Sequence, residues 1–241
     1  MSDDPRRILI TGANGTLGHA TALYFLERDP ACLVFLGVRE RRDRAQVLVT
    51  EFPGRAFLCP LETMSAESWA AAMNQIGPLS VLINNAGCHD DALLANMTQA
   101  QWSGVLDVNL NAVFLGCQAA LQPMMRLRGG RIVNIASLSA LHPPAGQTNY
   151  AAAKAGVLAL TQSLAKETAR MGITVNAVCP GHIEGALPTD WSEEQIKAVR
   201  RATPMRRFAR PDEIAAVVFF LASAEASYMT GTSLKLDGGL V

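Results

Sequence analysis

Short apolar runs alternate along the chain with longer segments whose apolar residues recur at helical spacing. The short runs are nearly continuous in hydrophobicity, which is typical of strands buried on both faces of a parallel sheet. The runs that predict strands are Ile8–Thr11, Leu33–Val38, Ala56–Cys59, Leu79–Asn84, Arg131–Ala136, Thr174–Val178 and Ser233–Leu236. The segments that predict helices are Thr16–Arg28, Ser65–Ile76, Gln99–Leu127, Tyr150–Met171, Ser192–Arg201 and Asp212–Ala224.

This alternation predicts an α/β fold, a doubly wound parallel sheet of about seven strands with helices on both faces. No linker, internal repeat or low-complexity segment divides the 241 residues, so we expect a single domain over 1–241. Residues 182–208 are less regular and contain Gly185, Pro188 and Pro204. An irregular segment of this length is usually functional, so we expect a substrate lid there, with a surface insertion as the alternative.

Composition and charge exclude several classes of function. The 21 Lys and Arg residues balance the 21 Asp and Glu residues, which argues against a nucleic-acid or anionic membrane partner. The five cysteines are scattered and the four histidines lack ligand spacing, so we expect no disulfide framework and no metal site. The longest apolar stretch, Ile214–Ala224, has 11 residues, well below the ~20 that span a bilayer. A cytoplasmic protein is therefore expected.

A glycine-rich segment joins the first predicted strand to the first predicted helix. It contains Gly12, Asn14, Gly15, Thr16, Leu17 and Gly18. Glycines at such a junction let the backbone approach a pyrophosphate, which the positive N-terminus of the helix attracts. The segment predicts a dinucleotide site, and a tight turn that binds nothing is the alternative.

Arg39 directly follows the second predicted strand, where dinucleotide folds selective for an unphosphorylated ribose carry an acidic residue. A guanidinium suits the 2′-phosphate of NADP, so we expect NADPH (NADP+) in preference to NADH. Arg41, Arg42 and Arg44 come next. For these three, the solvated start of a helix is the better interpretation.

Candidate catalytic groups lie at the ends of later strands. Asn85, Ala86 and Gly87 end the fourth predicted strand, where ligands of a doubly wound sheet lie. Tyr150 and Lys154 are four residues apart and share one face of the predicted helix. An ammonium beside a phenol lowers the phenol's pKa, which would let Tyr150 exchange a proton near neutral pH. Ser137 ends the preceding strand, where its hydroxyl can hold a substrate oxygen.

These motifs occur in an order and spacing that resemble the short-chain dehydrogenase/reductase family over essentially the whole chain. Asn109, Pro180-Gly181 and Asp237-Gly238-Gly239 complete the likeness. The resemblance implies a Rossmann-type fold and an NADP-dependent oxidoreductase acting on a CH–OH or C=O group. It implies Tyr150 as general acid, with Lys154 on the nicotinamide ribose and Ser137 on the carbonyl. It also implies that Asn109 holds a water leading to Lys154, and that Pro180, Gly181 and Ile183 contact the cofactor.

Three positions depart from the family pattern. Thr16 stands where the family usually has a glycine, and Pro60 where it has an acid or amide for the adenine. Gly185 replaces a threonine that contacts the carboxamide, and Thr189 is a candidate substitute from further along. These departures concern cofactor affinity and not the fold.

Within the family, the phrases Gly172-Ile173-Thr174-Val175-Asn176 and Ala209-Arg210-Pro211-Asp212-Glu213 most resemble 3-oxoacyl-[acyl-carrier-protein] reductases. That likeness implies an acyl substrate presented by an acidic carrier protein, with Arg128 as a docking residue. It also implies a homo-oligomer, a tetramer or dimer, for which Val157, Leu158 and Leu160 are candidate contact residues. The alternatives are an alcohol or sugar dehydrogenase and a non-catalytic scaffold subunit that binds a cofactor.

Overall fold

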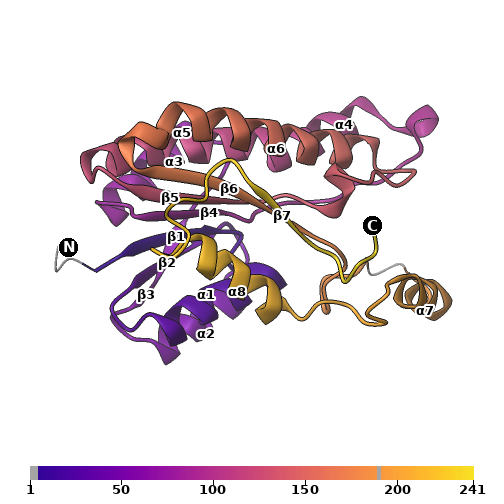
Figure 1. Cartoon of the computed structure of the whole chain (residues 1–241), viewed down its shortest axis with the longest axis horizontal. Helices are drawn as coiled ribbons and strands as arrows, with labels where there is room; N and C mark the ends of the chain where they lie inside the picture. The colour runs from indigo at the N-terminus through magenta and orange to yellow at the C-terminus, as the bar shows by residue number, and fades with distance from the viewer. Residues whose placement is uncertain (1–4, 189–190) are drawn as a thin grey trace.

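The strands form one parallel sheet in the computed structural model, which describes residues 5–188 and 191–241. Within these residues the sheet has seven strands in the order β3-β2-β1-β4-β5-β6-β7 (Figure 1). Their bounds are β1 Arg7–Thr11, β2 Leu33–Val38, β3 Ala56–Pro60, β4 Val81–Asn84, β5 Gly130–Ile135, β6 Ile173–Pro180 and β7 Ser233–Leu236. The predicted α/β fold with a doubly wound parallel sheet is therefore confirmed.

Helices cover both faces of the sheet (Figure 1). One layer contains α1 (Thr16–Arg28), α2 (Asp43–Glu51) and α8 (Pro211–Leu221). The other contains α3 (Ala66–Ile76), α4 (Gln99–Leu106), α5 (Ala112–Arg126) and α6 (Thr148–Thr168). The short helix α7 (Glu193–Ala202) stands to one side, in the predicted lid. Because each layer buries its own apolar cluster, β1, β4 and β5 are covered on both sides, as their sequences predict.

Two helix predictions need correction. The predicted helix Gln99–Leu127 is interrupted by a π-helical turn at Asp107–Asn111, which separates α4 from α5. Such a turn inserts a residue into the helical ladder and is frequent at functional sites. The apolar pattern does not predict α2, because this helix buries only Ala45 and Leu48; only the interpretation of Arg41, Arg42 and Arg44 as a helix start pointed to it. Short 3-10 turns lie at Leu94–Asn96, Leu138–Ala140 and Ala169–Met171.

The combined helical segment Gln99–Arg126 is long and apolar enough to cross a membrane by length and composition. In the fold, however, α4 packs against α6, and α5 packs against α3, β4 and β5. The segment is therefore an element of the α/β fold, although Phe114 and Met125 of α5 remain exposed.

Strand order determines where ligands can bind. The chain runs from β1 outward to β3, then crosses back to place β4 on the other side of β1. The connections after β1 and β4 therefore diverge toward opposite faces, and a crevice opens at the carboxyl ends of these two strands. The glycine-rich segment and Asn85–Gly87 both lie at this crevice.

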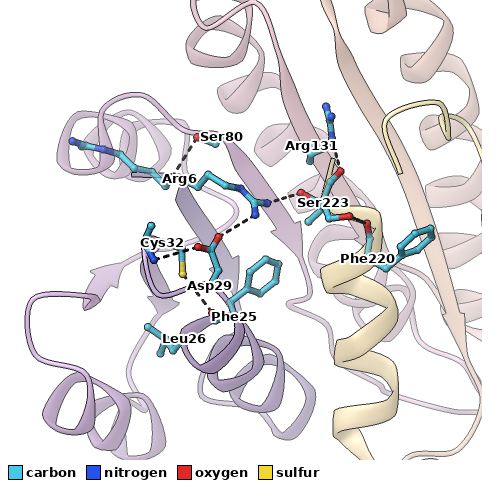
Figure 2. A network of polar contacts seen from close by, with 12 residues as sticks. Arg6, Phe25, Leu26, Asp29, Cys32, Ser80, Arg131, Phe220 and Ser223 are labelled. Carbon is cyan, nitrogen blue, oxygen red and sulfur yellow. Dashed lines mark hydrogen bonds and ion pairs between the residues drawn. The ribbon is translucent and has the colours of Figure 1, made fainter. Parts of the chain in front are cut away.

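A polar network lies at the amino ends of the central strands, opposite the crevice, and joins them to the ends of α1 and α8. The Arg6 guanidinium donates to the Asp29 carboxylate at 3.1 Å and to the carbonyl of Ala222, so it joins the ends of α1 and α8 (Figure 2). Arg131, on β5, donates to the carbonyl of Ser223 at 3.3 Å. The bonds to Ala222 and Ser223 satisfy carbonyls that the end of α8 leaves unpaired, while the contact with Asp29 is an ion pair at the end of α1.

Candidate active site

The glycine-rich segment folds tightly against the end of β4. Gly12 has φ +64°, and a Cβ there would lie 2.9 Å from Cα of Ala86. A Cβ on Gly18 would lie 2.4 Å from the Gly12 carbonyl oxygen. Only glycine fits at these two positions, because any side chain would push the segment away from β4.

Side-chain hydrogen bonds fix the shape of this crevice. The Thr11 hydroxyl accepts from the backbone N–H groups of Asn85 and Ala86, each at 2.9 Å. The Asn85 amide donates back to the carbonyl of Thr11 at 2.9 Å. Asn14 accepts from the backbone N–H groups of Arg44 and Ala45, which ties the segment to α2. The amide side chains therefore hold the loop in place. Within the loop, the N–H groups of Ala13 and Gly15 donate to the carbonyls of Gly37 and Gly12, so the N–H groups that can face a ligand are those at the start of α1.

The N-terminus of α1 suits a phosphate. The helix begins at Thr16 after Gly15, which has no side chain to cap it, and the first turn carries no acidic residue. The unpaired N–H groups and the helix dipole therefore point into the crevice with no competing anion in that turn. Gly12, Gly15 and Gly18 line the groove, and the absence of a Cβ at Gly12 and Gly18 lets the segment pack tightly enough to bring the start of α1 to this crevice. The residues present thus fit the pyrophosphate of a dinucleotide.

The far end of the same groove is rich in arginine. Arg39 lies at the end of β2 and is loosely paired with Glu62 at 3.7 Å and with Glu40 at 3.8 Å. Arg41 and Arg44 also line the groove, which the preferred interpretation of these residues as a solvated helix start missed. Arg44 also reaches toward the start of α1, where its guanidinium donates to the Thr16 hydroxyl at 3.3 Å.

The end of the groove beside β2 and β3 is partly aliphatic. Leu61 is buried and lines the groove together with Val38, whereas Pro60, the expected departure, ends β3 and is exposed. Thr63 and Glu62 complete this end. An adenine ring would therefore rest on aliphatic side chains there.

A second cavity adjoins this groove and contains the predicted catalytic residues. Ser137, Tyr150 and Lys154 line it, and Pro180, Gly181 and Ile183 form its wall. The groove and the cavity share Leu17, Asn85, Gly87 and Ala186, so they form one continuous depression. The structure thus brings together the predicted cofactor and catalytic residues.

Asn109 lies behind this cavity, beside Lys154. A Cβ on Gly87 would lie 2.8 Å from Oδ1 of Asn109 and 3.7 Å from Nζ of Lys154, so both polar atoms border the same small residue. The π turn orients Asn109: its amide donates to the carbonyls of Cys88 at 2.8 Å and Val105 at 2.9 Å. Its Oδ1 is buried and has no hydrogen-bond partner among the described residues. A buried acceptor of this kind is a suitable place for a bound water.

Lys154 is almost fully buried, with 3% of its surface exposed, and Nζ donates to the carbonyl of Ile135 at 2.8 Å. Burial lowers the pKa of this ammonium to about 8. Lysine in this position therefore loses its proton far more easily than a lysine in water.

The expected lowering of the Tyr150 pKa is wrong for this structure. Burial raises the pKa of Tyr150 to about 12, and its hydrogen bond with Ser137 lowers it only in part. Lys154 approaches the face of the ring, with Nζ 5.6 Å from the centroid. The cost of removing the phenolate from water is greater than these stabilising contacts. Tyr150 therefore keeps its proton at neutral pH, as a general acid must.

Sequence reasoning missed a polar network at the mouth of the cavity. The His89 and Tyr150 rings lie with centroids 3.8 Å apart. Asp91 is 3.7 Å from His89 and accepts from the Gln147 amide at 2.7 Å. Gln147 accepts in turn from the Ser139 hydroxyl at 2.9 Å. The available signal was that His89 and Asp91 directly follow the motif that ends β4.

Other predicted residues lie away from this site. Arg128 is exposed and precedes β5, at the edge of the sheet opposite the catalytic cavity. Val157 and Leu158 are buried within the chain itself, so they are not available as oligomer contacts, which corrects that expectation. Thr189 lies outside the described residues. In the part of the chain that the structure describes, all five cysteines are free and no group of three potential metal ligands forms a site.

Fold and site together define a Rossmann-type oxidoreductase that acts on a CH–OH or C=O group. Residues 12–241 match the family described as "Enoyl-(Acyl carrier protein) reductase". The chain thus belongs to the short-chain dehydrogenase/reductase family, whose members bind a nicotinamide cofactor.

Individual relatives cover nearly the full chain. The 3-oxoacyl-[acyl-carrier-protein] reductase FabG of Thermotoga maritima is 38% identical over 237 residues, which is 97% of this chain and 96% of the relative. The "Nodulation protein G" of Rhizobium sp. (strain N33) is 39% identical over 239 residues, covering 98% and 96%. An acetoacetyl-CoA reductase of Allochromatium vinosum is 43% identical over 166 residues, covering 69% and 68%.

Proposed function

We propose that the protein reduces the 3-oxo group of an acyl thioester to a 3-hydroxy group with NADPH. The observation that carries this proposal is that one continuous depression contains three features. They are the uncapped N-terminus of α1, which suits a phosphate, the arginines around Arg39, and the protonated Tyr150 beside Ser137. Relatives named as 3-oxoacyl-[acyl-carrier-protein] and acetoacetyl-CoA reductases support the substrate class. We further propose one cytoplasmic domain over 1–241, in which 182–208 is the substrate lid.

Each candidate residue has a role in this scheme. Ser137 donates its hydroxyl hydrogen to the carbonyl oxygen and orients it. Tyr150, hydrogen-bonded to Ser137 and still protonated, gives its proton to that oxygen as negative charge develops. Lys154 and a water on Oδ1 of Asn109 return a proton toward Tyr150. The nicotinamide, when bound, supplies the hydride.

The cofactor residues follow from the groove. The backbone of Gly12–Gly18 and the N-terminus of α1 would hold the pyrophosphate. Arg39, supported by Arg41 and Arg44, would pair with a 2′-phosphate and thereby select NADPH over NADH. Pro180, Gly181 and Ile183 would line the nicotinamide end, together with Asn85, Ala86 and Gly87.

For the partner, we propose an acyl-carrier protein that presents the substrate, with Arg128 as a docking contact. Arg128 lies at the opposite edge of the sheet from the cavity, so its effect must be on capture of the carrier and not on the chemistry. Arg128→Glu is expected to raise the KM for a carrier-bound substrate and to leave the KM for a CoA thioester unchanged. We also propose a homo-oligomer, a tetramer or dimer, which light scattering tests.

The decisive test is the initial rate of NADPH and NADH oxidation with acetoacetyl-CoA, measured for the wild type and for Tyr150→Phe. Turnover with NADPH that falls about a hundredfold or more in the variant is the expected result. Turnover only in the oxidative direction with an alcohol or sugar would favour a dehydrogenase. Nucleotide binding without any turnover would favour a scaffold subunit.

A further inference from the structure

Thr16 connects three segments that are far apart in the chain. Its hydroxyl donates to the carbonyl of Gly185 at 2.9 Å. The Arg44 guanidinium donates to the same hydroxyl oxygen at 3.3 Å. The three residues belong to the start of α1, the start of α2 and the segment that follows β6. One hydroxyl therefore links the glycine-rich segment to the root of the proposed lid.

This link lies at the border between the cofactor groove and the catalytic cavity. Thr16 and Arg44 line the groove, and Ala186, next to Gly185, lines both depressions. A Cβ on Gly185 would lie 3.5 Å from Cγ2 of Thr16, so the two residues are already in close contact. The Thr16–Gly185 hydrogen bond therefore lies across the side of the groove that faces the proposed lid.

The lid root, residues 183–186, is held on its other side by backbone bonds. Ile183 pairs with Ala209 in a parallel bridge, and the Glu184 N–H donates to the Ala209 carbonyl at 2.9 Å. The Ala209 N–H donates to the His182 carbonyl at 3.0 Å. Gly185 turns away from this pairing with φ +72° and directs its carbonyl to Thr16. Thr16 is thus the second support of the lid root.

We propose that Thr16 is a positioning residue that holds the lid root over the cofactor groove, so that release of the nucleotide requires the Thr16–Gly185 bond to break. This inference rests on the proposed function, because it takes the groove to be the dinucleotide site. Thr16 acts through the lid and not on the reacting atoms. Its loss therefore affects nucleotide exchange more than the chemical step.

The test compares Thr16→Val, which removes only the hydroxyl from a side chain of the same shape, with Thr16→Ser, which keeps it. Hydrogen exchange of the amides in 183–186 is measured in the nucleotide-free protein, and the NADPH dissociation rate is measured by stopped-flow fluorescence. In Thr16→Val, the amides of 183–186 are expected to exchange faster than in the wild type. The NADPH dissociation rate is expected to rise about three- to tenfold, which is the effect of losing one modest hydrogen bond. Thr16→Ser is expected to match the wild type in both.

Thr50→Val is the matched control, since Thr50 also donates to a backbone carbonyl, at 3.1 Å within α2, far from the lid in the chain. It is expected to leave exchange at 183–186 unchanged. Thr16→Gly gives a second variant that introduces no apolar group. Wild-type exchange and wild-type dissociation in both Thr16→Val and Thr16→Gly would overturn the proposal. A wild type that binds neither NADPH nor NADH would instead contradict the proposed function, whatever the exchange rates.

Discussion

Replacing Lys154 by methionine is expected to stabilise the fold while it destroys activity. Lys154 is buried, and its pKa falls from 10.5 to about 8 on folding. That change corresponds to about 3 kcal/mol by which folding disfavours the charged form. Methionine has a similar shape and no charge, so this cost disappears. The variant leaves the Ile135 carbonyl without its donor, which costs about 1–2 kcal/mol. The free energy of unfolding at pH 7 is therefore expected to rise by about 1–2 kcal/mol.

The pH dependence gives a sharper test of the same reasoning. Between the folded pKa of about 8 and the unfolded value of 10.5, the unfolded chain holds a proton on Lys154 that the folded chain has released. The stability of the wild type therefore rises with pH in this window. From pH 7 to pH 9.5 it is expected to gain about 2 kcal/mol relative to Lys154→Met, which cancels other titrations.

The measurement is urea unfolding of both proteins at the two pH values, followed by circular dichroism. Lys166→Met is the control, because Lys166 lies on the same helix and is exposed. The pH-dependent change in the stability gap of Lys154→Met is compared with that of this exposed-lysine control. A Lys154→Met protein that is less stable than the wild type at pH 7, or a gap that does not change by pH 9.5, would refute the argument.

Three other predictions follow from contacts of single residues. Gly18→Ala is expected to abolish NADPH binding in a fluorescence titration and to cost about 1–3 kcal/mol in stability, because the new Cβ would lie 2.4 Å from the Gly12 carbonyl oxygen. Ser65→Ala removes the N-cap bond of α3 and is expected to cost about 1 kcal/mol in urea unfolding with unchanged kcat. Burial lowers the pKa of His89 below 6.5, so its ring becomes charged only in acid, 3.8 Å from the Tyr150 ring. His89→Phe keeps the ring contact and is expected to remove one acid limb from the pH profile of kcat/KM; an unchanged profile would show that this imidazole does not affect Tyr150.

The hydrophobic pattern predicted the sheet well, because buried parallel strands are continuous apolar runs. β2 and β7 begin and end where expected, and the other strands shift by one or two residues. The apolar pattern did not predict α2, in which only Ala45 and Leu48 are buried, and it did not predict the π turn. A π turn inserts one residue and so shifts the phase of the apolar pattern only at the junction between α4 and α5. The sequence therefore contains little sign of it, although it is what orients Asn109.

Ser137 and Asn85–Gly87 were predicted from their place at strand ends and Tyr150 with Lys154 from helical spacing, whereas Asn109 came only from the family resemblance. The energetics of these residues were not predicted. The prediction that Lys154 lowers the Tyr150 pKa considered the charge and left out burial, which depends on the packing of distant segments. The Thr16–Gly185 contact joins residues 169 positions apart. Each appeared in the sequence as a separate departure, and only the folded chain shows that the two departures meet.

The packing of α8 on α1 determines when the nucleotide site can become rigid. Phe219 of α8 lies 5.1 Å from the ring of Phe25 and 5.6 Å from that of Tyr24, and Arg6 joins the ends of both helices. A ribosome makes the glycine-rich segment and α1 first and α8 nearly 200 residues later. During most of synthesis, α8 is not yet present to cover the apolar face of α1. The helix whose N-terminus would hold the phosphate can then pack only against the strands and α2, and not against α8. A nascent chain that stops before α8 would expose Phe25 and lack a firm cofactor site.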